Sequence, residues 1–335
     1  MKFHYQFDIK KLPEPISHLH KLFLIGSCFT ENIGEKLKNN KFSVLENPNG
    51  ILFNPVSVAE ALTDYIDNKV FKEEDLFYYN ESWHSWKHHS RFSGISAADA
   101  LNKINPAIGQ AHSFLKQADY AIITLGSSWI YTFTEKAVNA RKGSVAANNH
   151  KAPSEWFFRR LMTLEEVLKI LDNLMHRLFL FNPKLKIIFT ISPVRHLREG
   201  VIENNRSKAL LITAVHHLVD KFERLFYFPA YELVIDDLRD YRFYAEDLVH
   251  PNYFATQYVW EKLVQSAMTE ETRKLMEEIA SINLAFQHKA FNPKSDQHKK
   301  FLASYFEKTK LLQEHYPQLD FSKELTYFSF KDITG

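Results

Sequence analysis

The chain is poor in the residues that form covalent cross-links and membrane segments. Its 335 residues include one cysteine and nine glycines, and no apolar run approaches the length of a membrane span. A single cysteine cannot form an intrachain disulfide, which removes the usual cross-link of small secreted proteins. Residues 1–12 contain no continuous apolar segment of the kind found in secretory signals. We therefore expect a soluble cytoplasmic protein.

The chain also has little net charge. Its 42 Lys and Arg residues barely exceed its 40 Asp and Glu residues, which gives a formal charge of +2. This balance provides no electrostatic basis for binding nucleic acid or an anionic membrane, so neither is expected as a partner. The hydrophobic content of 45%, with 28 Phe and 15 Tyr, is enough for a full core with aromatic packing. We expect one large domain with an appendage, or two domains.

Short β-branched or aromatic runs alternate with longer stretches of helical period, which indicates an α/β fold with a parallel sheet covered by helices. The expected strands are Lys21–Ile25, Phe42–Leu45, Tyr120–Leu125, Lys186–Ile191 and Glu232–Ile235. The expected helices are Phe29–Asn39, Val56–Asp67, Ala97–Gln117, Leu164–Phe181 and Asn204–Phe222. Because crossovers between parallel strands are right-handed, the loops after the strands gather along one edge of the sheet. A ligand site is expected there.

Some segments depart from this alternation. The aromatic, His-rich stretch 77–94 and the stretch 126–153 are long enough to form pocket walls or lids rather than simple turns. From Thr269 to about His315 the pattern is helical and charged, with a break at Asn292-Pro293. We therefore divide the chain into a main domain, residues 1–265, and a C-terminal helical appendage, residues 266–335.

The only cysteine, Cys28, lies where an apolar run meets the small-residue turn Gly26-Ser27 and a helix is expected to begin. Such a turn lifts one side chain clear of the sheet, and the N-terminus of the helix favours a thiolate or an oxyanion. A thiol with an unperturbed pKa near ~8.5 is only slightly ionised at neutral pH, so catalysis needs a base or the helix N-terminus. Taken alone, a cysteine more often packs as a small buried hydrophobe.

Asp247 and His250 supply a candidate base in a loop that closes with Pro251. The carboxylate can bind the ring nitrogen that faces away from the nucleophile and so hold the histidine in the useful tautomer. In the alternative, Asp247 merely caps a turn. A nucleophile-type turn after the first strand, followed by this loop near the end of the sheet, favours the catalytic interpretation.

Several blocks resemble, in the same order, those of the GSCFA domain family. They are Gly26-Ser27-Cys28-Phe29, Trp83-His84-Ser85-Trp86, Leu125-Gly126-Ser127-Ser128-Trp129, Ser192-Pro193-Val194-Arg195-His196, Phe228-Pro229-Ala230-Tyr231-Glu232 and residues 240–251. The resemblance covers most of the chain, including the helical end around Ala290-Phe291-Asn292-Pro293. The family looks like a branch of the SGNH, or GDSL-like, hydrolases, which implies a flavodoxin-like three-layer α/β/α sandwich for residues 1–265.

The resemblance also implies catalytic residues. The Gly-Asp-Ser turn of the SGNH superfamily falls on Gly26, Ser27 and Cys28, so Cys28 holds the nucleophile position and Ser27 the Asp position. A shift by one residue would make Ser27 the nucleophile. Asp247 and His250 match the block that supplies the orienting carboxylate and the base.

The implied oxyanion hole departs from the superfamily pattern. Its donors would be the amides of Cys28 and Gly50 and the hydroxyl of Ser128, which stands where the superfamily has asparagine. A hydroxyl still donates one hydrogen bond, although its rotor is less fixed than an amide.

Arg195 and His196 follow an expected strand and should lie at the ligand edge of the sheet. Arg195 could fork onto a carboxylate or phosphate of the substrate, and His196 could act as an auxiliary acid or base. A structural ion pair is an equal alternative for Arg195. Trp83 and Trp129 are expected to line the substrate pocket, with ordinary aromatic packing as the alternative.

His84 and His88 are four residues apart and would share one face of a helix, as in some zinc sites. The segment is better described as a strand, with Trp86 on the same face as these histidines and Glu81 as the nearest carboxylate. Ordinary aromatic packing is the default expectation here, with a pocket wall as the functional alternative, and neither a metal nor another cofactor is expected.

Together, the residues and the resemblance predict an esterase or acyltransferase that forms a covalent acyl-enzyme on Cys28, or on Ser27. The expected substrate is a small-molecule or carbohydrate-linked acyl ester. The alternative is a ligand-binding module that keeps the fold without catalysis, which the replacements at Ser27 and Ser128 would permit.

Overall fold

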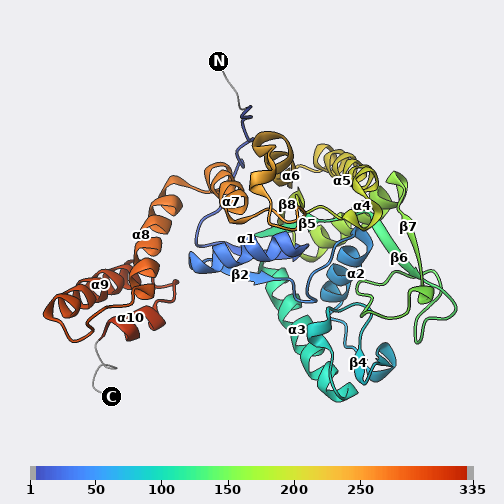
Figure 1. Ribbon diagram of the computed structural model, residues 1–335, viewed down its shortest axis with the longest axis horizontal. Helices are drawn as coiled ribbons and strands as arrows, with labels where there is room; N and C mark the ends of the chain where they lie inside the picture. The colour runs from blue at the N-terminus through green and yellow to red at the C-terminus, as the bar shows by residue number, and fades with distance from the viewer. Residues whose placement is uncertain (1–4, 330–335) are drawn as a thin grey trace.

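Five parallel strands form the central sheet of the protein (Figure 1), in a computed structural model that describes residues 5–329. The order across the sheet is β2 (Ser43–Glu46), β1 (Lys21–Gly26), β5 (Tyr120–Leu125), β8 (Lys186–Ile191) and β9 (Leu225–Tyr227). All neighbouring pairs are parallel. The chain runs outward from β1 to β2 and then builds the other side from β5, so the strand order reverses between β1 and β5. In such sheets the ligand crevice lies outside the carboxyl ends of the strands at this point.

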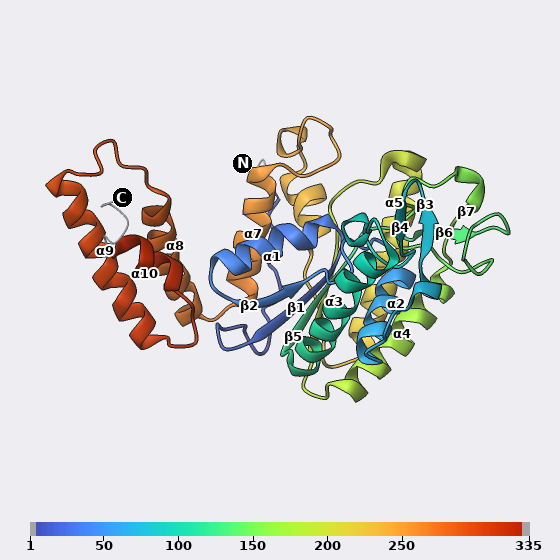
Figure 2. The same cartoon turned by 90° about the horizontal axis from the view of Figure 1, so that it is seen from below.

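Helices cover both faces of the sheet because its central strands are apolar on both sides. In β1, Phe23 and Ile25 belong to one core, whereas Leu22 and Leu24 belong to the other. The first core is covered by α2 (Pro55–Ile66), α3 (Ala97–Gln117), α4 (Leu164–Phe181) and α5 (Val201–Lys221). The second is covered by α1 (Cys28–Asn39), α6 (Ala230–Glu232), the π-helical η5 (Leu233–Leu238) and α7 (Tyr253–Ala267). Figure 2 shows α1 and α7 on the opposite side of the sheet from α2, α3 and α4. The three-layer α/β/α fold is therefore confirmed.

Most predicted elements are present, and β5, β8, α3 and α4 have the predicted bounds. The predicted strand Glu232–Ile235 is wrong, because these residues lie in α6 and η5 and the fifth strand is β9. Pro229 precedes this helical segment, and Leu233 and Val234 pack into the second core. A short apolar run fits either a strand or a buried helical segment, so periodicity alone could not separate them.

Two antiparallel hairpins project from the layered body. β3 (Phe77–Tyr79) pairs with β4 (Ser82–His84), and β6 (Trp129–Phe133) pairs with β7 (Phe157–Leu161). The predicted strand-like alternation along residues 83–88 is wrong beyond His84, since the chain turns there and the amide of His88 donates to the carbonyl of Ser85. Short 3-10 turns lie in the loops at Glu73–Asp75, Ser90–Phe92, Ser154–Trp156, Leu197–Glu199 and Tyr241–Phe243.

The last helices form a separate unit at one end of the molecule (Figure 2). They are α8 (Glu270–Gln287), α9 (Asp296–His315) and α10 (Ser322–Phe328), and the predicted break at Asn292-Pro293 lies between α8 and α9. Their own core contains Leu275, Ile279, Ile282, Leu302, Leu312, Phe321 and Phe328. The chain passes from α7 to α8 between Ala267 and Glu270, and the division at residue 265 stays a prediction. Across residues 5–329, none of the helices has the length and apolar character needed to cross a lipid bilayer.

Candidate active site

Cys28 is the first residue of α1 and comes directly after the turn that ends β1. Gly26 has a φ of +141°, and a Cβ atom there would lie 2.1 Å from the carbonyl oxygen of Thr124 on β5. Glycine is required because the two backbones approach so closely. Ser27 is the N-cap residue of α1, and its amide donates to the same carbonyl at 3.2 Å. The turn therefore places Cys28 at a helix N-terminus, beside the end of β5.

The thiol of Cys28 and the hydroxyl of Ser27 differ in accessibility. Cys28 is partly exposed, whereas Ser27 is fully buried and its hydroxyl has no hydrogen-bond partner among the described residues. Burial raises the pKa of the Cys28 thiol, although the amides of Phe29 and Cys28 and the charge of Lys208 act to lower it. Glu31 raises this pKa further. A base is therefore needed to form the thiolate at neutral pH.

Asp247 and His250 form a hydrogen-bonded pair in the turn before α7. Nδ1 of His250 donates to Oδ2 of Asp247 at 2.6 Å. The other carboxylate oxygen accepts the amides of Val249 at 2.9 Å and His250 at 3.0 Å. The hydrogen bonds from the amide and side chain of His250, and then that from Val249, lower the pKa of Asp247 to about 2. With Nδ1 bound to the carboxylate, Nε2 is the nitrogen left for proton transfer.

The loop after β8 holds this turn in place. The amide of Arg195 donates to the carbonyl of Val249 at 3.2 Å, and its guanidinium donates to that of Leu248 at 3.1 Å. The guanidinium also lies 4.1 Å from the ring centroid of Tyr244. Leu248 has a φ of +57°, an uncommon conformation for its residue type that these contacts help to hold. Arg195 thus supports the turn that carries His250, and its role in substrate binding stays a prediction.

His196 and Lys208 interact electrostatically with the two halves of the site, His196 with His250 and Lys208 with Cys28. Burial, followed by the charges of Lys208 and His250, lowers the pKa of His196 to about 3, so its ring is neutral at physiological pH. Lys208 also acts electrostatically on Cys28. Among the described residues, no hydrogen bond joins the thiol of Cys28 to His250. Proton transfer between them therefore requires a side-chain movement or a bridging water.

The two other predicted oxyanion donors already have partners. The amide of Gly50 donates to the carbonyl of Asn47 at 2.7 Å, and a Cβ atom on Gly50 would lie 2.2 Å from Cβ of His89. The hydroxyl of Ser128 is fully buried and donates to the carbonyl of Ser207 at 3.2 Å. Either group would have to exchange its partner before it could bind an oxyanion.

A buried polar face on α5 was not anticipated from the sequence. Asn204, Ser207 and Lys208 are spaced as neighbours on one side of the helix and are 4%, 2% and 1% exposed. The amide of His196 donates to Asn204 at 2.9 Å, and the amide of Ser128 donates to the hydroxyl of Ser207 at 2.7 Å. This face therefore fixes the loops after β5 and β8. The helical spacing of the polar residues was the one signal that could have revealed it.

A cavity of about 430 Å³ opens at this edge of the sheet. Trp129, Arg195 and His196, which were predicted to bind substrate, all line it. Its other lining residues are Phe53, Asn54, Ser127, Tyr131, Ala146, Ala147, Asn148, Asn149, Leu197, Arg198 and Glu199. Segment 126–153 thus forms part of a pocket wall. Trp83 lies instead in the hairpin of β3 and β4, where its ring contacts Tyr78.

The histidines of the hairpin region have partners within the protein. His84 bonds to the hydroxyl of Ser93 at 2.6 Å, and Nδ1 of His88 bonds to the hydroxyl of Ser85 at 2.8 Å. Within residues 5–329, no group of three or more His, Cys, Asp or Glu side chains is placed to hold a metal ion.

Comparison with protein families agrees with the blocks identified in the sequence. The model of the GSCFA family matches residues 21–263, which include the whole sheet and the Asp247–His250 turn. The chain belongs to the GSCFA family. A second model, for the C-terminal domain of GSCFA domain proteins, matches residues 279–331. No curated protein matches the chain.

Two solved structures match this GSCFA chain with low sequence identity and low TM-scores. A carbohydrate esterase family 3 protein from Talaromyces cellulolyticus is 10% identical with a TM-score of 0.36, and the match covers 78% of this chain and 99% of that chain. The acetyl xylan esterase Est2A from Butyrivibrio proteoclasticus is 12% identical with a TM-score of 0.38, and the match covers 75% of this chain and 64% of that chain. At these values the similarity carries no information on activity.

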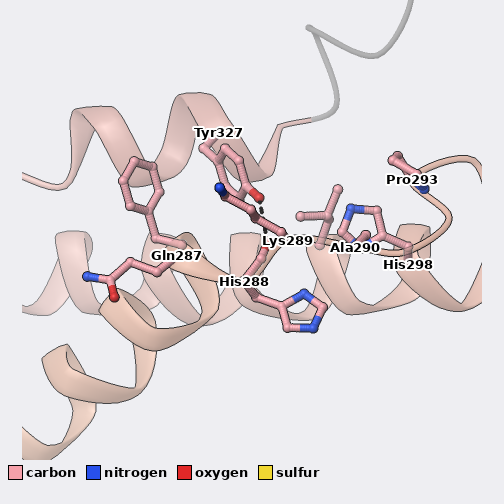
Figure 3. Close-up of a pocket in the computed structure, with 9 residues that line it drawn as sticks. Gln287, His288, Lys289, Ala290, Pro293, His298 and Tyr327 are labelled. Carbon is pink, nitrogen blue, oxygen red and sulfur yellow. Dashed lines mark hydrogen bonds between the residues drawn. The ribbon is translucent and has the colours of Figure 1, made fainter.

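A second cavity, of about 660 Å³, lies among the C-terminal helices (Figure 3). Beside it, the hydroxyl of Tyr327 donates to the carbonyl of His288 at 3.2 Å. Its lining residues are Phe286, Gln287, His288, Lys289, Ala290, Pro293, His298, Leu302 and Tyr327. None of the residues predicted for catalysis or substrate binding lines this cavity, so it is separate from the candidate active site.

Proposed function

We propose that the protein catalyses acyl transfer, as an esterase or acyltransferase, through the thiol of Cys28. The observation that carries this proposal is the 2.6 Å hydrogen bond between His250 and Asp247, in a turn braced by the loop after β8. Cys28 follows β1 at the same carboxyl edge of the sheet, next to the point where strand order reverses. A thiol at a helix N-terminus and a histidine oriented by a carboxylate are the parts that nucleophilic catalysis needs.

In the proposed reaction, Nε2 of His250 takes the thiol proton, and the sulfur bonds to the carbonyl carbon of an ester or thioester. The carbonyl electron pair moves to oxygen, where the amide of Cys28 stabilises it. The intermediate then collapses, the bond to the leaving alcohol or thiol breaks, and the leaving group receives the proton from His250. Water or an acceptor alcohol, deprotonated by His250, attacks the resulting thioester. The carbon–sulfur bond then breaks, an acid or a new ester is released, and the sulfur of Cys28 receives the proton from His250.

The burial of Ser27 supports Cys28 rather than Ser27 as the nucleophile. The Ser27 hydroxyl is fully enclosed, so a substrate carbonyl cannot reach it, whereas the Cys28 thiol is partly exposed. Gly50 and Ser128 remain candidate oxyanion donors, on the condition that they exchange their present partners.

The 430 Å³ cavity beside this edge is the proposed binding site for the rest of the substrate, a small-molecule or carbohydrate-linked acyl ester. Nε1 of Trp129 and Nε2 of His196 are buried and have no hydrogen-bond partner among the described residues. Both line the cavity, so they are suited to bind polar groups of a ligand.

The test is a panel of short-chain aryl esters and acyl thioesters, assayed with the wild type and with the matched variants Cys28→Ala and Ser27→Ala. We expect Cys28→Ala to lose at least about 100-fold in kcat/KM, since the covalent route is removed, and Ser27→Ala to retain most activity. Activity that survives loss of the thiol but not loss of the hydroxyl would transfer the nucleophile role to Ser27.

A ligand-binding module without catalysis is the second candidate function. It is favoured by the burial that raises the pKa of the Cys28 thiol. Alkylation by iodoacetamide at neutral pH separates the two candidates. The catalytic site predicts fast labelling that slows in His250→Ala, whereas equally slow labelling of both proteins would favour the binding module.

A further inference from the structure

The 430 Å³ cavity at the carboxyl edge of the sheet carries an excess of positive charge. Three charged side chains line it, Arg195, Arg198 and Glu199. Glu199 forms an ion pair with Arg159 of β7 at 2.7 Å, and its side chain is only 6% exposed, so its negative charge is already compensated. The positive charge of the two lining arginines is therefore not balanced by a carboxylate of the cavity wall.

The two arginines differ in the partners that they already have. Arg195 donates to the carbonyl of Leu248 and lies over the ring of Tyr244, so it is engaged with the turn before α7. Arg198 donates through Nη1 to the hydroxyl of Tyr131 at 2.7 Å, and within residues 5–329 no carboxylate lies at ion-pair distance from it. A guanidinium has five N–H donors in a planar fork, so Arg198 keeps donors that can bind a carboxylate or a phosphate.

The bond to Tyr131 holds this guanidinium at the wall of the cavity, beside a second free donor. Tyr131 follows Trp129 by two residues on β6, so the two rings point to the same face of the strand, and both line the cavity. Nε1 of Trp129 is buried and has no hydrogen-bond partner among the described residues. Because an indole N–H can only donate, the group that satisfies it must be an acceptor. An anion with several oxygens can accept from both side chains.

The remaining polar groups of the wall do not repel an anion. Asn54, Asn148 and Asn149 are neutral amides, and the ring of His196 is neutral at physiological pH. Asn54 is also the N-cap residue of α2, whose first turn contains no acidic residue. The positive end of this helix dipole therefore adds to the charge of the arginines.

We propose that this cavity binds an anionic group, a carboxylate or a phosphate, and that Arg198 and Nε1 of Trp129 determine this specificity. The inference deepens the proposed function and rests on it for one point, that the anionic group belongs to the substrate or to the acceptor of the acyl group. Binding of the anion itself does not involve the thiol of Cys28.

The test is a calorimetric titration with three probes that share a pyranose ring and differ at C6: glucose 6-phosphate, glucuronate and glucose. We expect at least one of the two anions to bind about tenfold or more tightly than glucose, since charge-assisted hydrogen bonds are stronger than neutral ones. The anion that binds more tightly shows whether the site prefers a phosphate or a carboxylate.

Three variants assign the binding to its donors. Arg198→Met should weaken anion binding about tenfold and leave glucose unaffected, because the charge and the fork are lost. Trp129→Phe keeps an aromatic ring without the N–H group and should weaken anion binding about fivefold. The matched control Arg206→Met removes an exposed charge of α5 that pairs with Glu203 at 2.8 Å, and it should bind all probes as the wild type does.

Equal affinity for the three probes, failure of both anions to bind, or wild-type anion affinity in Arg198→Met would overturn the proposal. Thermal unfolding confirms that each variant is folded. The titration requires no turnover. Anion binding that depends on Arg198, in a protein that cleaves no ester or thioester, would therefore refute the proposed function only. An active enzyme that binds the three probes equally would refute the anion site only.

Discussion

The substitution Asp247→Asn tests the orientation of the proposed base. In the structure the carboxylate accepts Nδ1–H of His250 through one oxygen and the amides of Val249 and His250 through the other. An asparagine keeps one oxygen, which can still accept the two backbone amides and preserve the turn. Its NH₂ group then faces Nδ1, so this nitrogen must become an acceptor and the ring proton moves to Nε2. In that tautomer, Nε2 cannot accept the thiol proton.

We expect kcat/KM for an aryl ester to fall by about 100- to 10,000-fold, the range lost when a general base is disabled or held in the wrong tautomer. Asp240→Asn is the matched control. Asp240 caps a short turn in the same region and pairs with Arg242 at 2.9 Å, and within residues 5–329 no hydrogen bond or ion pair joins it to His250. The control should keep activity within a few-fold of the wild type.

The assay is kcat/KM against pH for the wild type and both variants, with thermal unfolding to confirm that each is folded. A folded Asp247→Asn protein with wild-type kcat/KM would refute the assignment of His250 as the base.

Three further predictions concern the support of the site. Gly26→Ala should lower the free energy of unfolding in urea by about 3 kcal/mol, because the Cβ atom of the alanine would lie 2.1 Å from the carbonyl oxygen of Thr124. A loss below about 1 kcal/mol would contradict this prediction. Arg195→Met should reduce kcat about tenfold with little change in KM, because the turn that carries His250 loses the hydrogen bond from the guanidinium. A rise in KM alone would instead assign Arg195 to substrate binding. Burial lowers the pKa of His88 from 6.5 to about 3, so unfolding takes up a proton between these pH values and stability should fall as the pH is lowered through this range. His88→Gln should flatten the dependence of the urea midpoint on pH, and an unchanged slope would count against the buried neutral ring.

The sheet could be predicted where burial leaves a clear pattern. β5 and β8 are predominantly apolar runs of six residues each and are flanked by long amphipathic helices, so their bounds follow from the sequence. β9 is three residues long and pairs with only one neighbour, and so its signal is weaker than that of the apolar run in η5 that follows it.

Within the site, the local pair was predictable and the longer-range partners were not. Asp247 and His250 are close in sequence, and their hydrogen bond follows from one turn. Lys208 contacts carbonyls 82 and 16 residues away, which no local pattern reveals. The partner of the Ser128 hydroxyl, Ser207, likewise depends on how α5 packs on the sheet.

Trapping of the acyl-enzyme tests the central claim most directly. The protein is mixed with an aryl ester, quenched in acid and digested, and the peptide that contains Ser27 and Cys28 is sequenced by mass spectrometry. The proposed mechanism predicts one acyl group on Cys28 in the wild type, slower acylation in His250→Ala and none on this peptide in Cys28→Ala. An ester that is turned over without acylation of Cys28, or an acyl group on the peptide of Cys28→Ala, would contradict it.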